Sequence, residues 1–144
     1  MIPFVRDIKF RYGEVDQVSP LIRRVICNNP GPFTFTGTGT YIVGRGEVAV
    51  IDPGPDMAEH LAAQLAAVSG ERVTAILTTH THVDHSPLAR PLAEATGAPI
   101  YGRAAPESEA EDIRMDEANE AWFAPDVVLA EGDAVRGPGW TLRA

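Results

Sequence analysis

The chain has 144 residues, 44% of them hydrophobic and 22% charged, a composition typical of one globular domain. Its formal net charge of -8 disfavours non-specific nucleic-acid binding, since polyanions are repelled at long range. The sequence contains no signal-peptide pattern and no apolar run near the roughly 20 residues of a membrane helix. Its single cysteine, Cys27, cannot form an internal disulfide and is expected to be buried. We therefore expect a cytoplasmic protein with a small-molecule substrate and no membrane partner. No sequence pattern sets its oligomeric state.

The first regular elements that the sequence predicts are two strands joined by a tight turn. Residues 41–43 and 48–51 are apolar and rich in β-formers, and they flank Gly44-Arg45-Gly46-Glu47. Asp52-Pro53-Gly54-Pro55 follows the second strand and must end it, because proline has no amide hydrogen for a ladder.

A helix is predicted after this turn. Asp56 is typical of a helix N-cap, and Glu59 would complete a capping box. Gly70 stands where a C-cap glycine is common. His60 lies alone on an alanine-rich stretch and is expected to be an exposed surface residue. Apolar residues recur at helical spacing, which predicts one face packed on a sheet: Leu61, Leu65 and Val68.

A second strand–helix unit is predicted next. Residues 73–78 form a short apolar run typical of a buried strand, so the order strand, helix, strand implies a parallel crossover. Ser86 is expected to cap a second helix, with Pro87 at its first position and Gly97 at its end. Pro91 predicts a kink or a late start of this helix. Two residues of the helix would face inward: Leu88 and Leu92.

The remaining sequence predicts short strands around an acidic segment. Residues 98–102 are typical of a strand, and so are residues 127–129 and 140–142. Seven carboxylates lie within residues 107–120, which favours a solvated helix or loop over a lid or a metal ligand. The pattern as a whole predicts an α/β layered fold.

Three of the four histidines fall within the six residues 80–85. His80 and His82 are one residue apart, so an extended segment would point both imidazoles to the same side, and Asp84 continues that series. Two imidazoles can supply two of the protein ligands of zinc, whose catalytic sites use three protein ligands and a water. The motif can supply one metal from His80 and His82, and a second from Asp84 and His85.

The motif at residues 80–85, following an apolar strand, resembles the metal-binding motif of the metallo-β-lactamase superfamily. The Asp-Pro-Gly turn at residues 52–54 is similar to an aspartate turn of that superfamily. The runs at residues 29–34 and 37–44 resemble its hydroxyacylglutathione-hydrolase-like and β-lactamase-like-protein-2 branch. Gly39 departs from this branch, where relatives commonly have asparagine.

The resemblance implies an αββα sandwich, of which this chain would supply mainly the N-terminal half as one domain over residues 1–144, incomplete at its C-terminus. It implies two zinc ions, although iron or manganese also accept these ligands. Asp84 would orient the nucleophile and take up its proton, and Asp52 would hold the motif loop from outside the ligand set. The implied ligands are His80 and His82 for one metal, and Asp84 and His85 for the other.

The function that the resemblance implies is hydrolysis of a thioester or ester, such as an acylglutathione, by hydroxide activated at the metals. One alternative is an endonuclease of the same fold acting on single-stranded RNA. Hydrolysis of β-lactams fits less well, because such enzymes are typically exported. Relatives also have two further histidines and a bridging aspartate downstream, whereas no histidine follows His85 in this sequence. The other alternative is therefore a non-catalytic half-domain that binds metal weakly or not at all.

Overall fold

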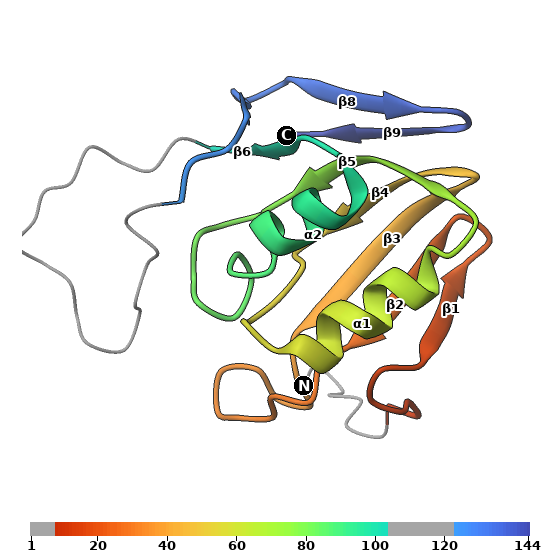
Figure 1. The fold of residues 1–144 in the computed structure, drawn as a ribbon, viewed down its shortest axis with the longest axis vertical. Helices are drawn as coiled ribbons and strands as arrows, with labels where there is room; N and C mark the ends of the chain where they lie inside the picture. The colour runs from red at the N-terminus through yellow and green to blue at the C-terminus, as the bar shows by residue number, and fades with distance from the viewer. Residues whose placement is uncertain (1–7, 104–122) are drawn as a thin grey trace, which may run out of the picture.

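The computed structural model describes residues 8–103 and 123–144, which form a mixed seven-stranded sheet, two helices and a separate hairpin (Figure 1). The strands lie in the sheet in their chain order. Strands β1 to β4 are antiparallel, and strands β4 to β7 are parallel. The sheet strands are β1 (Val15–Ser19), β2 (Ile22–Ile26), β3 (Gly39–Arg45), β4 (Glu47–Ile51), β5 (Arg72–Leu77), β6 (Ile100–Gly102) and β7 (Val127–Val128).

The predicted hairpin of two apolar strands is confirmed as β3 and β4, which pair antiparallel with Arg45 opposite Glu47. Gly44 and Gly46 have φ of 100° and 75°, in the left-handed region that favours glycine. The parallel crossover is also confirmed: helix α1 (Ala58–Ala67) connects β4 to β5, which pair in parallel. Helix α2 (Ala89–Thr96) then connects β5 to β6.

The start of α1 differs from the prediction. Met57 is its N-cap residue and makes no side-chain capping hydrogen bond, so the capping box of Asp56 and Glu59 is wrong. The cause is local: the amide of Met57 donates to the Pro55 carbonyl (2.7 Å), so the preceding turn extends further than expected and Asp56 still belongs to it. The expectation that His60 is exposed is also wrong, because only 3% of it is accessible.

Helix α2 starts late, as Pro91 predicted, and keeps that proline in its first turn, where it removes no helical hydrogen bond. Its N-cap is Leu88, so the expected capping position at Ser86 is wrong. Leu88 and Leu92 are buried as predicted. Gly97 is the C-cap, with φ of 74°, also as predicted.

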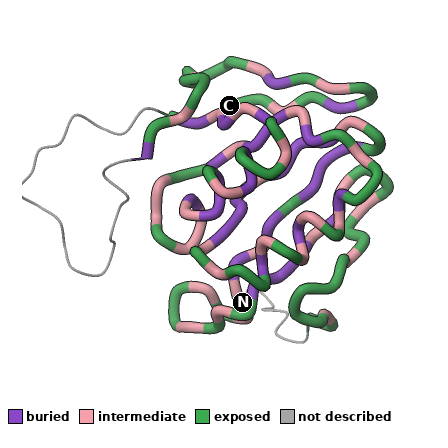
Figure 2. Tube along the Cα trace, viewed as in Figure 1, coloured by how far each residue is buried: buried purple, intermediate pink, exposed green. Residues whose placement is uncertain are grey.

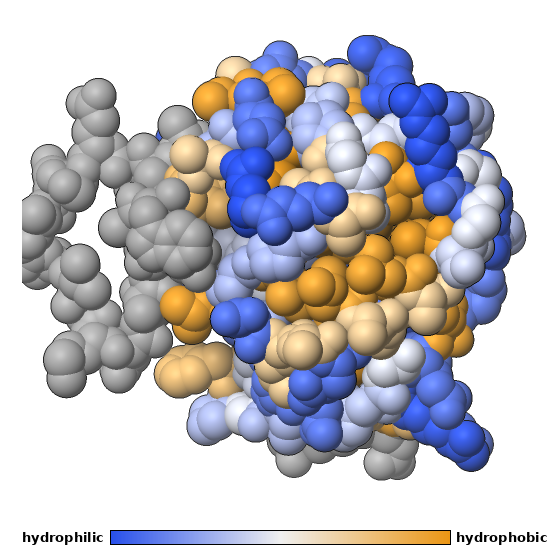
Figure 3. Space-filling view, in the orientation of Figure 1, coloured by the Kyte–Doolittle hydropathy of each residue, from blue (hydrophilic) through white to orange (hydrophobic). Residues whose placement is uncertain are grey.

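The buried residues divide into two clusters, one on each face of the sheet. Figure 2 marks the buried residues along the chain. Val48 and Val50 of β4 belong to the cluster under the helices, and Ala49 between them belongs to the opposite one, as the two-residue period of a strand requires. Apolar side chains also gather on the surface along α1 and between the two helices (Figure 3). Cys27 is buried, as expected.

The face away from the helices is covered in part by a hairpin of β8 (Ala134–Gly137) and β9 (Trp140–Arg143). The prediction included β9 but not β8, and it placed residue 129 in the strand that ends at Val128. Trp140 anchors the hairpin by donating from Nε1 to the Glu47 carbonyl at 3.0 Å. A cavity of about 980 Å³ lies on this face, with apolar lining from Ile51, Leu77, Val128, Leu129, Val135 and Leu142.

The acidic residues 107–120 lie outside the described residues. Among the residues that the structure describes, no helix is long and apolar enough to cross a membrane.

Candidate metal centre

The candidate site lies where the parallel strands β4 and β5 end side by side. Asp52 follows β4 directly, and its amide donates to the carbonyl of Leu77, the last residue of β5, at 2.8 Å. The motif loop leaves β5 at the same edge. Asp52 has φ of 51°, an uncommon conformation for a residue other than glycine, and this aims the chain into the Pro53-Gly54 turn beside the loop.

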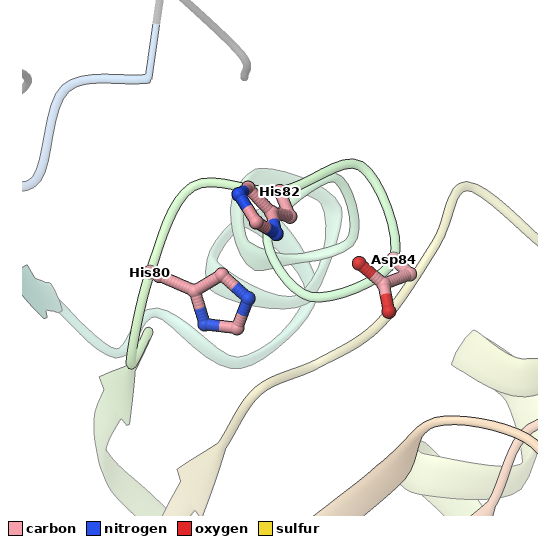
Figure 4. Close-up of side chains that lie close together, drawn as sticks. All are labelled: His80, His82 and Asp84. Atoms are coloured by element: carbon pink, nitrogen blue, oxygen red, sulfur yellow. The ribbon is translucent and has the colours of Figure 1, made fainter. Parts of the chain in front are cut away.

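Figure 4 shows the side chains of His80, His82 and Asp84 gathered at one place on the loop. One ligand atom of each residue lies within 4.8 Å of the others, and the centroids of the two imidazole rings are 4.5 Å apart. The segment is not extended as the same-side argument assumed, because β5 ends at Leu77 and a turn follows His82. The rings therefore meet through loop folding, in which the amide of His85 donates to the His82 carbonyl (2.9 Å).

His85, the fourth residue of the motif, joins the same group. Its Nε2 lies 3.2 Å from Asp84 Oδ2, and its ring centroid is 4.1 Å from that of His80. Its Nδ1 lies 3.0 Å from Asp52 Oδ2, yet this buried nitrogen has no partner that meets hydrogen-bond geometry. The contact with Asp52 is therefore electrostatic rather than a well-aligned hydrogen bond.

Thr79 connects Asp52 to the first histidine of the motif. The Thr79 amide donates to Asp52 Oδ1 (2.7 Å), and its hydroxyl donates to Asp52 Oδ2 (2.8 Å). The same hydroxyl oxygen lies 2.8 Å from His80 Nδ1. Because its one proton already goes to Asp52, the oxygen must accept from His80 Nδ1–H. The network thus assigns a tautomer whose Nε2 lone pair is free for a ligand. Thr79 stands at the start of the motif in the sequence, but the motif pattern predicted no role for it.

The pKa values of His80 and His85, the first and last histidines of the motif, are shifted in opposite directions. Partial burial lowers the pKa of His80, and the neighbouring imidazoles of His85 and His82 lower it further. The contact with the Asp52 carboxylate raises the pKa of His85, and Asp84 adds to this effect. His80 is thereby kept neutral, the form that binds metal, whereas a metal must displace a more tightly held proton from His85.

Asp84 is also contacted by Thr38, which lies in the segment before β3. The hydroxyl of Thr38 lies 3.5 Å from Asp84 Oδ2. Asn29 holds Thr38 in place by accepting its amide hydrogen at Oδ1 (2.8 Å) and donating from Nδ2 to its hydroxyl oxygen (3.0 Å). At Gly39, the departure noted above, an added Cβ would meet the side chains of Tyr41 and Arg24 rather than the histidine cluster.

The fold is a mixed α/β sheet that carries a candidate set of metal ligands at one edge. A beta-lactamase domain protein from Burkholderia ambifaria has a similar structure: its TM-score is 0.67 at 21% identity, with 95% of this chain and 51% of that chain covered. The model of the metallo-beta-lactamase superfamily matches residues 34–144. The chain belongs to this superfamily, as the resemblance of its motif predicted.

Three curated relatives each match about half of the chain. Lactamase-like protein ptaB of Pestalotiopsis fici is 44% identical over 78 residues, which are 51% of this chain and 25% of that protein. An atrochrysone carboxyl ACP thioesterase of Aspergillus fumigatus is 46% identical over 76 residues, 51% of this chain and 24% of that protein. A beta-lactamase-like protein 2 homolog of Caenorhabditis elegans is 35% identical over 75 residues, which are 49% of this chain and 25% of that protein. The match thus spans about a quarter of each relative.

Proposed function

We propose that this chain carries part of the metal centre of a hydrolase that cleaves thioesters. The observation that supports it best is the convergence of His80, His82 and Asp84, whose ligand atoms lie within 4.8 Å of one another. Imidazole and carboxylate groups are donors that suit zinc, iron or manganese. The donor set fits a metal for a second reason, because the contact with Thr79 leaves Nε2 of His80 free.

In the proposed site His80 and His82 hold one metal, and Asp84 and His85 hold a second. Bound zinc would supply Lewis acidity and lower the pKa of water to roughly 7. Asp84 would accept a proton, and the contacts of its carboxylate with Thr38 and His85 at the cluster support this role. Asp52 stabilises the loop from outside the ligand set, by accepting the hydrogen bonds of Thr79.

The chemical class of the substrate is proposed from the relatives. The Aspergillus fumigatus relative is named as a thioesterase for an acyl group on a carrier protein, and a thioester is also the bond in an acylglutathione. A second candidate, cleavage of single-stranded RNA, comes from the β-lactamase-like-protein-2 resemblance. The net charge of -8 disfavours it, because grooves that follow a phosphate backbone are usually basic.

Metal content is the first test. The protein is purified, passed through gel filtration in metal-free buffer and analysed for metal per chain. We expect zinc to be retained by the wild type and lost in His82→Ala. A wild type without retained metal after zinc loading would contradict the metal centre and favour the non-catalytic half-domain.

Turnover is the second test. The zinc-loaded protein is given an acylglutathione, an acyl-pantetheine thioester and a short single-stranded RNA, and the released thiol or RNA fragments are measured. We expect thiol release that a chelator abolishes and zinc restores. RNA cleavage without thiol release would contradict the thioesterase proposal and favour the endonuclease.

A further inference from the structure

Two buried polar side chains of α1 point at the turn that carries Asp52. His60 and Gln64 lie one helical turn apart, on the face of α1 that packs on the sheet, where the sequence predicts apolar residues. Both are almost inaccessible, with 3% and 0% of their surfaces exposed. Burying a polar group is unfavourable unless it is hydrogen-bonded, so the partners of these two residues indicate what they stabilise.

Each of these side chains supports one carbonyl of the turn. Gln64 donates from Nε2 to the Pro53 carbonyl at 2.6 Å. The hydroxyl of Thr40 donates to the Asp52 carbonyl (2.7 Å), and the same oxygen lies 2.8 Å from His60 Nε2. Because the only hydroxyl proton of Thr40 goes to Asp52, His60 must donate from Nε2–H. His60 therefore acts on Asp52 through Thr40.

The third residue of the turn fits closely against the imidazole of His60. Gly54 has φ of 96°, and a Cβ added there would lie 2.9 Å from His60 Cδ2. The other side of Gly54 faces the motif loop. Its amide donates to the His85 carbonyl at 2.9 Å, and its carbonyl accepts from the Leu88 amide at 3.0 Å. The turn is thus held between α1 and the loop that carries the candidate ligands.

We propose that His60 and Gln64 are positioning residues of the metal centre. They fix the Asp52–Gly54 turn, and through it they fix the backbone at Thr79 and the position of His85. The proposal rests on the proposed metal centre, but the positioning step can be measured without metal. Asp52 Oδ1 accepts from the Thr79 amide, so the hydrogen exchange of that amide reports directly on the turn.

The test uses substitutions that remove a donor but keep the volume of the side chain. His60→Leu and Gln64→Met remove the two donors on α1, and Thr40→Val breaks the link between His60 and Asp52 without changing the helix. His60→Gln retains an amide donor and is the rescue variant. Val68→Ala is the matched control, because Val68 is buried at the C-cap of the same helix but packs in the helix-face core.

Two quantities are measured for each variant: zinc affinity by competition with a chromophoric chelator, and amide exchange of Thr79 in metal-free protein. We expect His60→Leu, Gln64→Met and Thr40→Val to weaken zinc binding by about 10- to 100-fold, the usual effect of losing a group that orients metal ligands. We expect the same variants to exchange the Thr79 amide faster. His60→Gln should lie close to the wild type in both measurements, and Val68→Ala should lower the Tm alone.

The proposal is overturned if the three donor-removing variants keep wild-type zinc affinity and Thr79 protection. It is also overturned if Val68→Ala, at an equal loss of Tm, changes both quantities as much as they do. If the wild type binds no zinc, the metal centre itself fails. Thr79 exchange then decides the positioning role alone: faster exchange in the donor-removing variants supports it, and unchanged exchange overturns it.

Discussion

Asp52 accepts two hydrogen bonds from Thr79 at one carboxylate, Oδ1 from the amide at 2.7 Å and Oδ2 from the hydroxyl at 2.8 Å. The two residues are 27 positions apart in sequence and follow neighbouring parallel strands. Asp52 is therefore more than a turn residue, since it fixes the first residue of the motif loop. The hydroxyl that it holds in turn accepts from His80.

Replacing Thr79 with valine should weaken metal binding by about tenfold or more. The substitution keeps the shape of the side chain and the backbone hydrogen bond, but it removes the hydroxyl that assigns the tautomer of His80. Zinc affinity measured by chelator competition checks this, with Thr79→Ser as the control that keeps the hydroxyl. Equal affinity in the valine and serine variants would contradict the tautomer assignment.

Replacing Asp84 with asparagine should remove most of the retained metal and most thioester hydrolysis, because a neutral amide is a weaker ligand and cannot take up a proton. The matched control is Asp126→Asn, which removes a carboxylate held by Arg90 and the Ile100 amide, away from the cluster. Metal analysis and thiol release are measured for both. Asp84 has no such role if its variant behaves like the control.

His60 should make the metal-free fold less stable in acid. Burial lowers the pKa of His60 to about 4 from the ordinary value of 6.5. The unfolded chain binds a proton at His60 below pH 6.5, whereas the folded chain does not until about pH 4. Stability therefore rises with pH across this window, and up to about 3 kcal/mol is lost as the pH falls through it.

Urea unfolding with chelator present, between pH 4 and 7, measures this dependence. We expect a flatter curve for His60→Gln, which has no group that titrates at that position. The raised pKa of His85 has the opposite effect, since its contribution to stability is lost as the pH rises. Parallel curves for the wild type and the glutamine variant would show that His60 does not cause the acid sensitivity.

Trp140 should hold the β8–β9 hairpin on the sheet. Its indole lies over Gly44 and Gly137, where an added Cβ would come within 2.4 and 2.2 Å of indole atoms. We expect Trp140→Ala to cost about 3 to 5 kcal/mol, the usual loss for a buried aromatic side chain. Trp140→Phe should cost less because it keeps part of the packing. Denaturant unfolding compares them, and equal stability of all three proteins would contradict the anchoring role.

Cys27 should be unreactive in the folded protein. The residue is 1% exposed, and burial raises the pKa of its thiol to about 11, so the reactive thiolate is scarce at neutral pH. A thiol-specific reagent at pH 8 should react slowly with the native chain and fully with the urea-unfolded chain. Rapid reaction of the native chain, without loss of structure, would contradict this.

Much of the fold followed from local pattern. The hairpin about Gly46, the crossover from β4 to β5 and the late start of α2, with Pro91 in its first turn, all depend on turn chemistry and short-range periodicity. The prediction was wrong at Asp56, at Ser86 and at His60. Periodicity identified an amphipathic helix, but the partners that select its inward face, Thr40 and the Asp52–Gly54 turn, lie elsewhere in the sequence.

The sequence by itself determined that the metal-ligand residues would be close together, because His80, His82, Asp84 and His85 stand within six residues and no folding can separate them far. Only the tertiary structure decided how they are oriented. The loop is irregular, so its shape depends on Asp52 from β4, Thr38 from before β3 and the buried polar face of α1. The sequence shows which ligand residues are present and how they are spaced. The tautomer of an imidazole and the direction of a carboxylate are instead set by hydrogen bonds between residues far apart in the chain.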